Sequence, residues 1–201
     1  AVAYLSQIIV VLSSTGLGLA VGASIKLSEA YGIGDFELVH SRVSTLFALC
    51  GILSIVSILM IPFTPIVLRI ANTPEEFIAI GTSYFNVSLV DMAVLFMDNA
   101  YVAVERARGN GGRILRLNFL ALSVKLIMTA FFIYGLNGGI TLIAVATLLS
   151  DLVIFLAGCC YMSDRSQVFC FDFRAIVMDG RVAGPMVKLS VPVVGEKLAF
   201  S

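Results

Sequence analysis

Long apolar runs alternate with short polar segments along the whole of this sequence. A membrane-spanning helix needs about 20 mostly apolar residues, and five stretches meet that requirement. They are residues 1–25, 43–68, 77–104, 117–134 and 140–162, and a sixth run begins near Leu189. Because the runs are long and lack the two-residue alternation of barrel strands, they predict an all-α integral membrane protein, a polytopic helical bundle.

The composition points to the same environment. Hydrophobic residues make up 59% of the chain and charged residues 13%, whereas soluble domains average about 45–50% and about 25%. The mean hydropathy is +1.02 and the formal net charge is 0. A lipid bilayer is therefore the expected partner, and nothing in the sequence indicates binding of nucleic acid.

The residues needed for catalysis or metal binding are scarce. His40 is the single histidine of the chain, and no set of residues resembles a catalytic triad or a phosphate-binding loop. The spacing of the cysteines fits neither a metal site nor a disulfide framework. These cysteines are Cys50, Cys159, Cys160 and Cys170. We therefore expect no enzyme activity, no catalytic residue, no bound metal and no cofactor.

The basic residues between the runs predict the orientation, because cytoplasmic loops carry an excess of Lys and Arg. One set of loops holds ten of them, and the other holds only Arg69. The ten are Lys26, Arg42, Arg106, Arg108, Arg113, Arg116, Arg165, Arg174, Arg181 and Lys188. We predict that this side faces the cytoplasm, and that the protein crosses the plasma (cytoplasmic) membrane several times.

Both ends of the chain lie inside apolar runs, so we expect it to be part of a longer protein. We divide it into a transmembrane bundle (residues 1–162), a cytoplasmic linking loop (163–187) and the start of a second bundle (188–201). The loop mixes aromatic and charged residues, which suits a segment at the membrane surface.

A series of short motifs follows the predicted spans in a fixed order. The series is Gly-x-Gly-Asp at 32–35, Tyr84-Phe85, Arg-x-Arg-Gly-Asn-Gly at 106–111, Gly139 followed after six residues by Ala146-Thr147, and Leu-Ser-Val-Pro-x3-Glu at 189–196. In order and spacing it resembles the multidrug and toxic compound extrusion (MATE) family of transporters, over nearly the whole chain. The resemblance implies helices two to six and the start of helix seven of a twelve-helix transporter built from two lobes.

Charged residues inside the predicted spans are the candidate site. A charge at the bilayer centre costs about 2.5–3.5 kcal/mol on insertion scales, so it usually faces a partner or a water-filled cavity. Asp91 and Asp98 are seven residues apart, so they share one helix face and stand about 10 Å apart along the axis. They could relay H⁺ or Na⁺ or balance a cationic substrate, or they could form structural hydrogen bonds or ion pairs.

Lys125 lies in the middle of the fourth span, and we expect it to pair with Asp91 or Asp151, or with an acid outside this chain. Some MATE members carry Asn-x-x-x-Asp in the corresponding helix; this chain departs from them, with Lys125 and Thr129 at about that place.

Thr147 matches the threonine of the family's Ala-Thr element, and Asp151 lies one turn beyond it on the same face. Thr147 could equally be a small residue that permits close helix packing.

Glu196 follows Pro192 in the sixth run and resembles the cation-binding glutamate in helix seven of some family members. It could instead pair with Lys197. The candidates for substrate or ion coupling are thus Asp91, Asp98, Lys125, Thr147, Asp151 and Glu196.

The resemblance and the intramembrane acids together predict a monomeric secondary transporter. We expect an antiporter that expels drugs or organic cations by alternating access, coupled to H⁺ or Na⁺. The alternative within the same superfamily is a flippase for a lipid-linked oligosaccharide or peptidoglycan precursor. A flippase should have a more cationic cavity, whereas the four intramembrane acids here outnumber Lys125 and Lys197.

Overall fold

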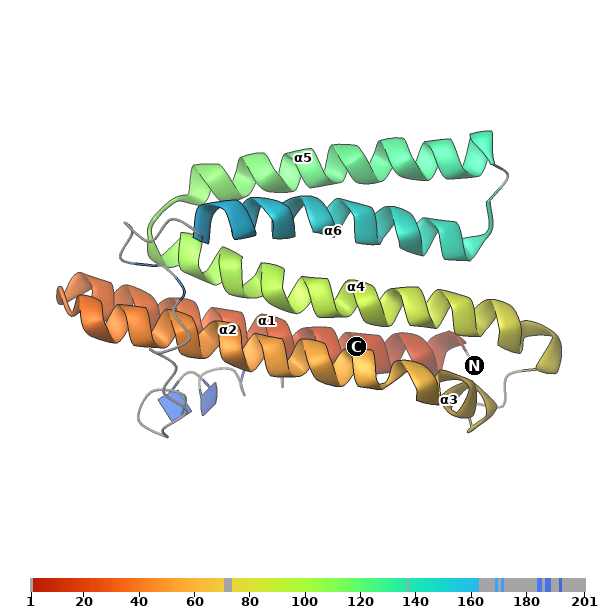
Figure 1. The fold of residues 1–201 in the computed structure, drawn as a ribbon, viewed down its shortest axis with the longest axis horizontal. Coiled ribbons are helices and arrows are strands. Elements are labelled where there is room, and N and C mark those ends of the chain that lie inside the picture. Colours follow the sequence, from red (N-terminus) through yellow and green to blue (C-terminus); the bar gives the residue numbers. More distant parts are fainter. Residues whose placement is uncertain are drawn as a thin grey trace.

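The chain forms a bundle of long helices that lie side by side in a computed structural model (Figure 1). The structure describes residues 2–70, 74–136, 138–162, 169, 171, 184–185, 187–188 and 192, with the backbone alone for 2–8, 11, 76 and 77. The elements are α1 (Val2–Gly32), α2 (Phe36–Leu59), a 3-10 turn η1 (Ile61–Phe63), α3 (Thr64–Ile70), α4 (Glu75–Ala107), α5 (Gly111–Ala130), a π-helical turn η2 (Phe131–Gly135) and α6 (Ile140–Met162). The predicted all-α class is confirmed.

Helix α4 is the centre of the bundle. Helices α1, α2 and α6 all pack against it, whereas α5 packs mainly on α6 (Figure 1). The large buried side chains of α4 include Phe85, Leu89 and Phe96. Residues on α4 therefore lie where the other helices meet, and a site within the bundle has to include them.

Four segments within the described residues are long and apolar enough to cross a membrane. They are Phe36–Ile70, Ile78–Ala107, Gly111–Gly135 and Ile140–Met162. Helix α5 exposes Phe119, Leu126 and Ile127, as expected for a surface in contact with lipid. These segments coincide with the second to fifth predicted spans, and the first predicted span falls within α1.

The second predicted span differs from the structure in its shape. It consists of two helices joined by η1, because Pro62 and Pro65 have no N–H to donate to the preceding turn. It also begins earlier than expected, at Phe36, because the Asp35 side chain caps the first turn by accepting a 3.0 Å hydrogen bond from the Leu38 N–H.

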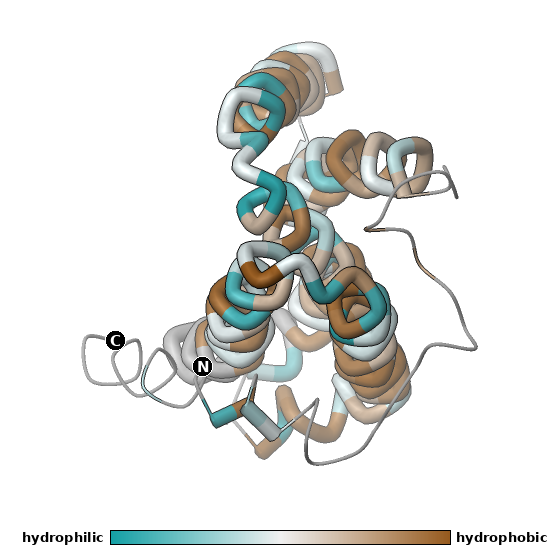
Figure 2. Tube along the Cα trace, turned by 90° about the vertical axis from the view of Figure 1, so that its left-hand side faces the viewer, coloured by the Kyte–Doolittle hydropathy of each residue, from teal (hydrophilic) through white to brown (hydrophobic). Residues whose placement is uncertain are grey.

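The two ends of the bundle differ in polarity. The α1–α2 turn, the α4–α5 turn and the end of α6 lie at one end, and the α5–α6 connection and α3 lie at the other (Figure 1). Figure 2 looks onto the first end, where hydrophilic residues gather at the helix turns. The described basic residues of that end are Lys26, Arg42, Arg106, Arg108, Arg113 and Arg116, whereas Arg69 belongs to the other. We call the first the basic end, and its cytoplasmic orientation stays a prediction.

Two kinds of close contact join the helices. Gly16 of α1 faces Phe96 of α4 so closely that a Cβ at position 16 would lie 2.5 Å from Cε1 of the Phe96 ring. The second kind is a serine hydroxyl that donates to the backbone of another helix. Ser54 Oγ donates to Ala93 O at 2.7 Å and joins α2 to α4, and Ser150 Oγ donates to Ala121 O at 2.8 Å and joins α6 to α5.

Candidate functional site

Asp91 lies in a cavity of about 160 Å³ between α1, α4 and α6, the α1–α4–α6 cavity. Ser13 of α1, Ser88 of α4 and Thr147 of α6 line the same cavity. Asp91 Oδ1 is buried and receives no hydrogen bond from the described residues. The structure therefore brings together two of the predicted site residues, Asp91 and Thr147, around one small space.

The hydroxyl groups of this cavity donate to the backbone of their own helices. Ser13 Oγ donates to Val10 O at 3.1 Å, and Ser88 Oγ donates to Tyr84 O at 2.9 Å. Thr147 Oγ1 donates in the same way to Ile143 O at 3.3 Å. Since each hydroxyl proton is used, the oxygen lone pairs are what remains for a ligand. The cavity thus combines one carboxylate with three hydroxyl oxygens, a set of acceptors that suits a cation.

Asp98 lies in a second and larger cavity, between α2, α4 and α6. This α2–α4–α6 pocket has a volume of about 610 Å³ and is bounded mainly by apolar side chains. Asp98 is only 4% exposed, and neither of its carboxylate oxygens has a hydrogen-bond partner in the described structure. Asp91 and Asp98 were expected to share a helix face, and each acts electrostatically with Asp151, yet they open into different cavities.

The expected ion pair between Lys125 and Asp91 or Asp151 is not formed. Within the described residues, no acid lies within ion-pair distance of Lys125, although its charge acts on both of these carboxylates. For Asp91 the reason is the packing: α5, which carries Lys125, packs mainly on α6, and α6 lies between α5 and most of α4. Lys125 thus interacts with the charges of Asp91 and Asp151 from a distance, without forming an ion pair with either.

The remaining predictions fall outside the described part of the chain. Glu196 and Lys197 lie beyond residue 192, the last one described. Most of the predicted linking loop (163–187) and of the second bundle (188–201) is also outside it.

Among the described residues, no group of three or more His, Cys, Asp or Glu side chains could hold a metal ion.

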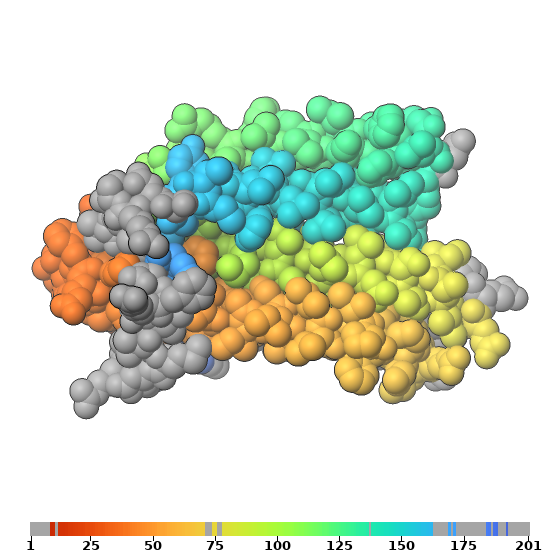
Figure 3. Space-filling view, viewed as in Figure 1, coloured from red at the N-terminus to blue at the C-terminus, as the bar shows by residue number. Residues whose placement is uncertain are grey.

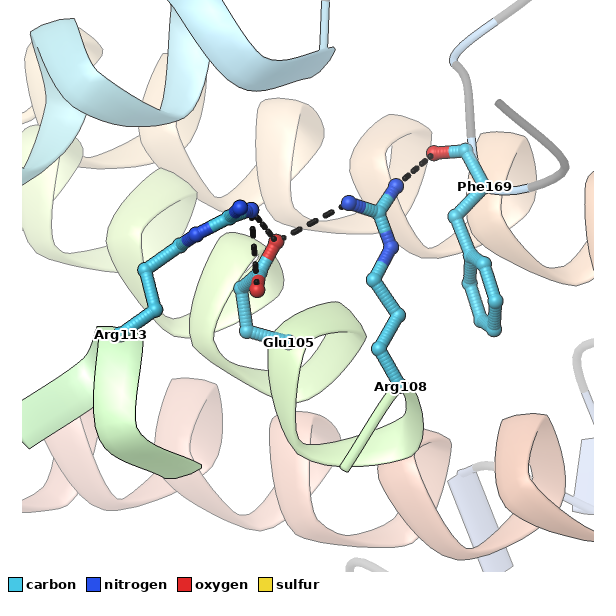
Figure 4. A network of polar contacts seen from close by, with 4 residues as sticks. All are labelled: Glu105, Arg108, Arg113 and Phe169. Carbon is cyan, nitrogen blue, oxygen red and sulfur yellow. Dashed lines mark hydrogen bonds and ion pairs between the residues drawn. The ribbon is translucent and has the colours of Figure 1, made fainter. Parts of the chain in front are cut away.

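A buried ion network at the basic end was not predicted from the sequence (Figure 4). The Glu105 side chain near the end of α4 is fully buried. Its Oε1 accepts hydrogen bonds from Arg108 Nη1 at 3.0 Å and Arg113 Nη1 at 3.3 Å. Arg108 Nη2 also donates to the carbonyl oxygen of Phe169 at 3.3 Å. The carboxylate therefore joins α4 to the start of α5, and Arg108 extends the network to a residue that follows α6.

The same arginines lie over aromatic rings. The Arg108 guanidinium carbon is 4.9 Å from the centre of the Phe169 ring, and that of Arg113 is 4.1 Å from the centre of the Tyr161 ring. Burial lowers the pKa of Arg108 below its usual value, and the Glu105 carboxylate opposes that shift.

The turn between Arg108 and Arg113 is fixed by the backbone. Gly109 has φ +76°, and the N–H of Asn110 donates to Glu105 O at 2.9 Å, as in a Schellman cap.

A signal for Glu105 was present in the sequence. It lies seven residues after Asp98, and Arg108 follows it at i+3, a spacing that favours ion pairs on a helix. We counted Arg108 and Arg113 only as loop charges that indicate orientation.

The fold and these charges define a multi-pass α-helical membrane protein. The model of the MatE family matches residues 1–132, and the chain belongs to that family of transporters. The motif series therefore identified the family correctly, and the members of this family are transporters rather than enzymes.

A curated relative is the probable multidrug resistance protein YoeA of Bacillus subtilis (strain 168), with 26% identity over 189 residues. That match covers 90% of this chain and 41% of the relative, so the chain spans about two fifths of its length.

Solved transporters share the fold. A crystal structure of MATE in complex with MaD3S has a TM-score of 0.90 and 21% identity, over 98% of this chain and 45% of that one. A MOP superfamily transporter from Pyrococcus furiosus Vc1 has a TM-score of 0.86 and 20% identity, over 98% of this chain and 44% of that one. Its binding pocket is described as having reversed polarity that suggests a different function. At these identities the likeness establishes the fold alone.

Proposed function

We propose that the intact protein is a monomeric antiporter of the plasma membrane that exports drugs or organic cations in exchange for H⁺ or Na⁺. Export would proceed by alternating access, in which the cavity opens to one side of the membrane at a time. The coupling ion would bind at Asp91, and the cargo would be held by the field of the intramembrane acids.

The observation that carries this proposal is the chemistry of the α1–α4–α6 cavity. Asp91 supplies a carboxylate with a free oxygen, and Ser13, Ser88 and Thr147 supply hydroxyl oxygens around it. A carboxylate at this depth needs a proton, a cation or water as its partner. A group that must take a cation from one side and release it on the other is what ion-coupled transport requires.

The sign of the charges favours a cationic cargo over a lipid-linked pyrophosphate. Asp91, Asp98 and Asp151 act on one another, and Lys125 is the basic residue that acts on Asp91 and Asp151. A flippase for an anionic headgroup would require the opposite balance. The relative from Bacillus subtilis, a probable multidrug resistance protein, supports drug export over a flippase but carries no information on the charge of the cargo.

The test is Asp91→Asn in the intact protein. Asn keeps the shape and the hydrogen bonds but cannot carry the change of charge, so we expect insertion to persist and the ion-gradient dependence of efflux to disappear. Efflux of a fluorescent cation from vesicles, normalised to protein amount, is measured with the H⁺ and Na⁺ gradients collapsed in turn.

Glu75→Gln is the matched control, because Glu75 is an exposed carboxylate on the same helix. It should leave coupling intact. Undiminished coupled efflux in Asp91→Asn would remove Asp91 from the mechanism, and a low protein level with normal coupling would assign it a structural role.

A further inference from the structure

The α2–α4–α6 pocket is a separate space from the cavity that contains Asp91. It is formed by Phe47 and its neighbours on α2, Asp98 and Tyr101 on α4, and Phe155 and Cys159 on α6. Figure 3 shows this face of the molecule, with α4 between α2 and α6. Its volume of about 610 Å³ lies within the range of about 300–1,000 Å³ typical of small-molecule sites.

The pocket opens at the side of the bundle, where exposed aliphatic side chains suit contact with lipid. Ile52 and Ile55 line it from α2 and are 46% and 59% exposed, and Cys159 lines it from α6 and is also exposed. Tyr101 and Met162 place the pocket in the half of the bundle nearest the basic end. A molecule dissolved in that leaflet could therefore reach the pocket without passing through water.

The chemistry of the pocket is unusual for a surface between helices and lipid. Its walls are mainly aliphatic and aromatic, and no Lys or Arg among the described residues lines it. The charged group is Asp98, buried with both carboxylate oxygens unpartnered. An apolar space with one unpaired carboxylate matches a molecule that has an apolar body and a single positive charge.

We propose that the α2–α4–α6 pocket binds amphiphilic organic cations from the membrane leaflet at the basic end, with Asp98 as their counter-ion. This inference depends on the proposed function in one respect, which is that the transported molecule is a cation. The site itself is distinct from the Asp91 cavity and provides lateral access from the bilayer. Aromatic side chains such as Phe47 and Phe155 contact the apolar body of the ligand, and Asp98 fixes its charged end.

Cys159 offers a direct measurement, because it lines the pocket. In the intact protein with Cys50, Cys160 and Cys170 replaced by Ser, held in lipid nanodiscs, N-ethylmaleimide should alkylate Cys159. Tetraphenylphosphonium should slow this alkylation, because it would occupy the pocket. Tetraphenylborate has the same shape and the opposite charge, and it should not slow the reaction.

Asp98→Asn should raise the tetraphenylphosphonium concentration that gives half-protection by about tenfold or more, as expected for loss of a charged partner. Half-protection is compared with each variant's own alkylation rate without ligand, because the Asp98 charge acts on the Cys159 thiol and its loss should speed the alkylation. A Cys159 that is still alkylated in Asp98→Asn shows that the pocket remains accessible. Asp91→Asn removes the same charge from the other cavity and should shift half-protection by only about threefold or less.

Three results would overturn the proposal. They are equal protection by tetraphenylborate, full protection in Asp98→Asn, and a Cys159 that N-ethylmaleimide does not reach in the intact protein. None of these results depends on whether efflux is coupled through Asp91, so either proposal can fail while the other holds.

Discussion

Two buried carboxylates on α4, only seven residues apart, have opposite surroundings. Glu105 is fully buried and accepts hydrogen bonds from two arginines at 3.0 and 3.3 Å (Figure 4). Asp98 is 4% exposed, and neither of its oxygens has a partner in the described structure. Both residues end up on the same side of one helix, so the difference comes from what the neighbouring elements present to them.

The contrast separates a structural charge from a charge that is open to a ligand. Glu105 is neutralised within the protein by Arg108 and Arg113, and Arg108 also donates to the Phe169 carbonyl oxygen. Asp98 and Asp91 face cavities, where a partner from outside can bind. Buried polar groups are normally satisfied, so unsatisfied carboxylates in cavities are candidates for ligand binding.

The largest effect on stability is expected at Glu105. Glu105→Gln removes the charge that neutralises two arginines, and breaking a buried ion network in this way typically costs about 3–5 kcal/mol. Asp98→Asn removes no pairing and should change the free energy of unfolding by less than about 1 kcal/mol. Denaturant titration of both variants of the intact protein in mixed micelles tests this, and equal losses would contradict the contrast.

A smaller difference is expected between the two arginines. The Arg108 side chain is 9% exposed and donates to both Glu105 and the Phe169 carbonyl, whereas Arg113 is 28% exposed. Arg108→Gln should therefore destabilise by about 2 kcal/mol and Arg113→Gln by about 1 kcal/mol. The same titration measures both, and a larger loss for Arg113→Gln would show that the contact with Phe169 contributes nothing.

The smallest effect is expected at Lys125, which contacts no acid within the described residues. Lys125→Ala should destabilise by about 1 kcal/mol or less, because only a longer-range interaction with Asp91 and Asp151 is lost. The double variant with Asp151→Asn should be no more stable than Lys125→Ala. A strong rescue by Asp151→Asn would mean that the two residues form an ion pair in the membrane.

The helices were predictable from the sequence, and the surroundings of the charges were not. Apolar length gave α6 to the residue and α4 to within three residues at each end, because a span needs a continuous run of apolar side chains. The break after Leu59 could have been predicted from Pro62 and Pro65.

The separation of Asp91 and Asp98 into different cavities could not be predicted in the same way. Helical spacing gives the face of a residue, but the cavity next to it depends on how α1, α2 and α6 pack on α4. The pairing of Glu105 with Arg113 likewise depends on the turn at Gly109, which brings two helices together.

The contact between Gly16 and Phe96 limits how the bundle can move. A slide of α1 along α4 by one helical turn, about 5.4 Å, would replace Gly16 by Ala20 opposite the buried Phe96 ring. The ring leaves no room for the extra methyl group. A slide of one turn would therefore require the Phe96 ring to move, so this contact holds α1 and α4 in register with each other.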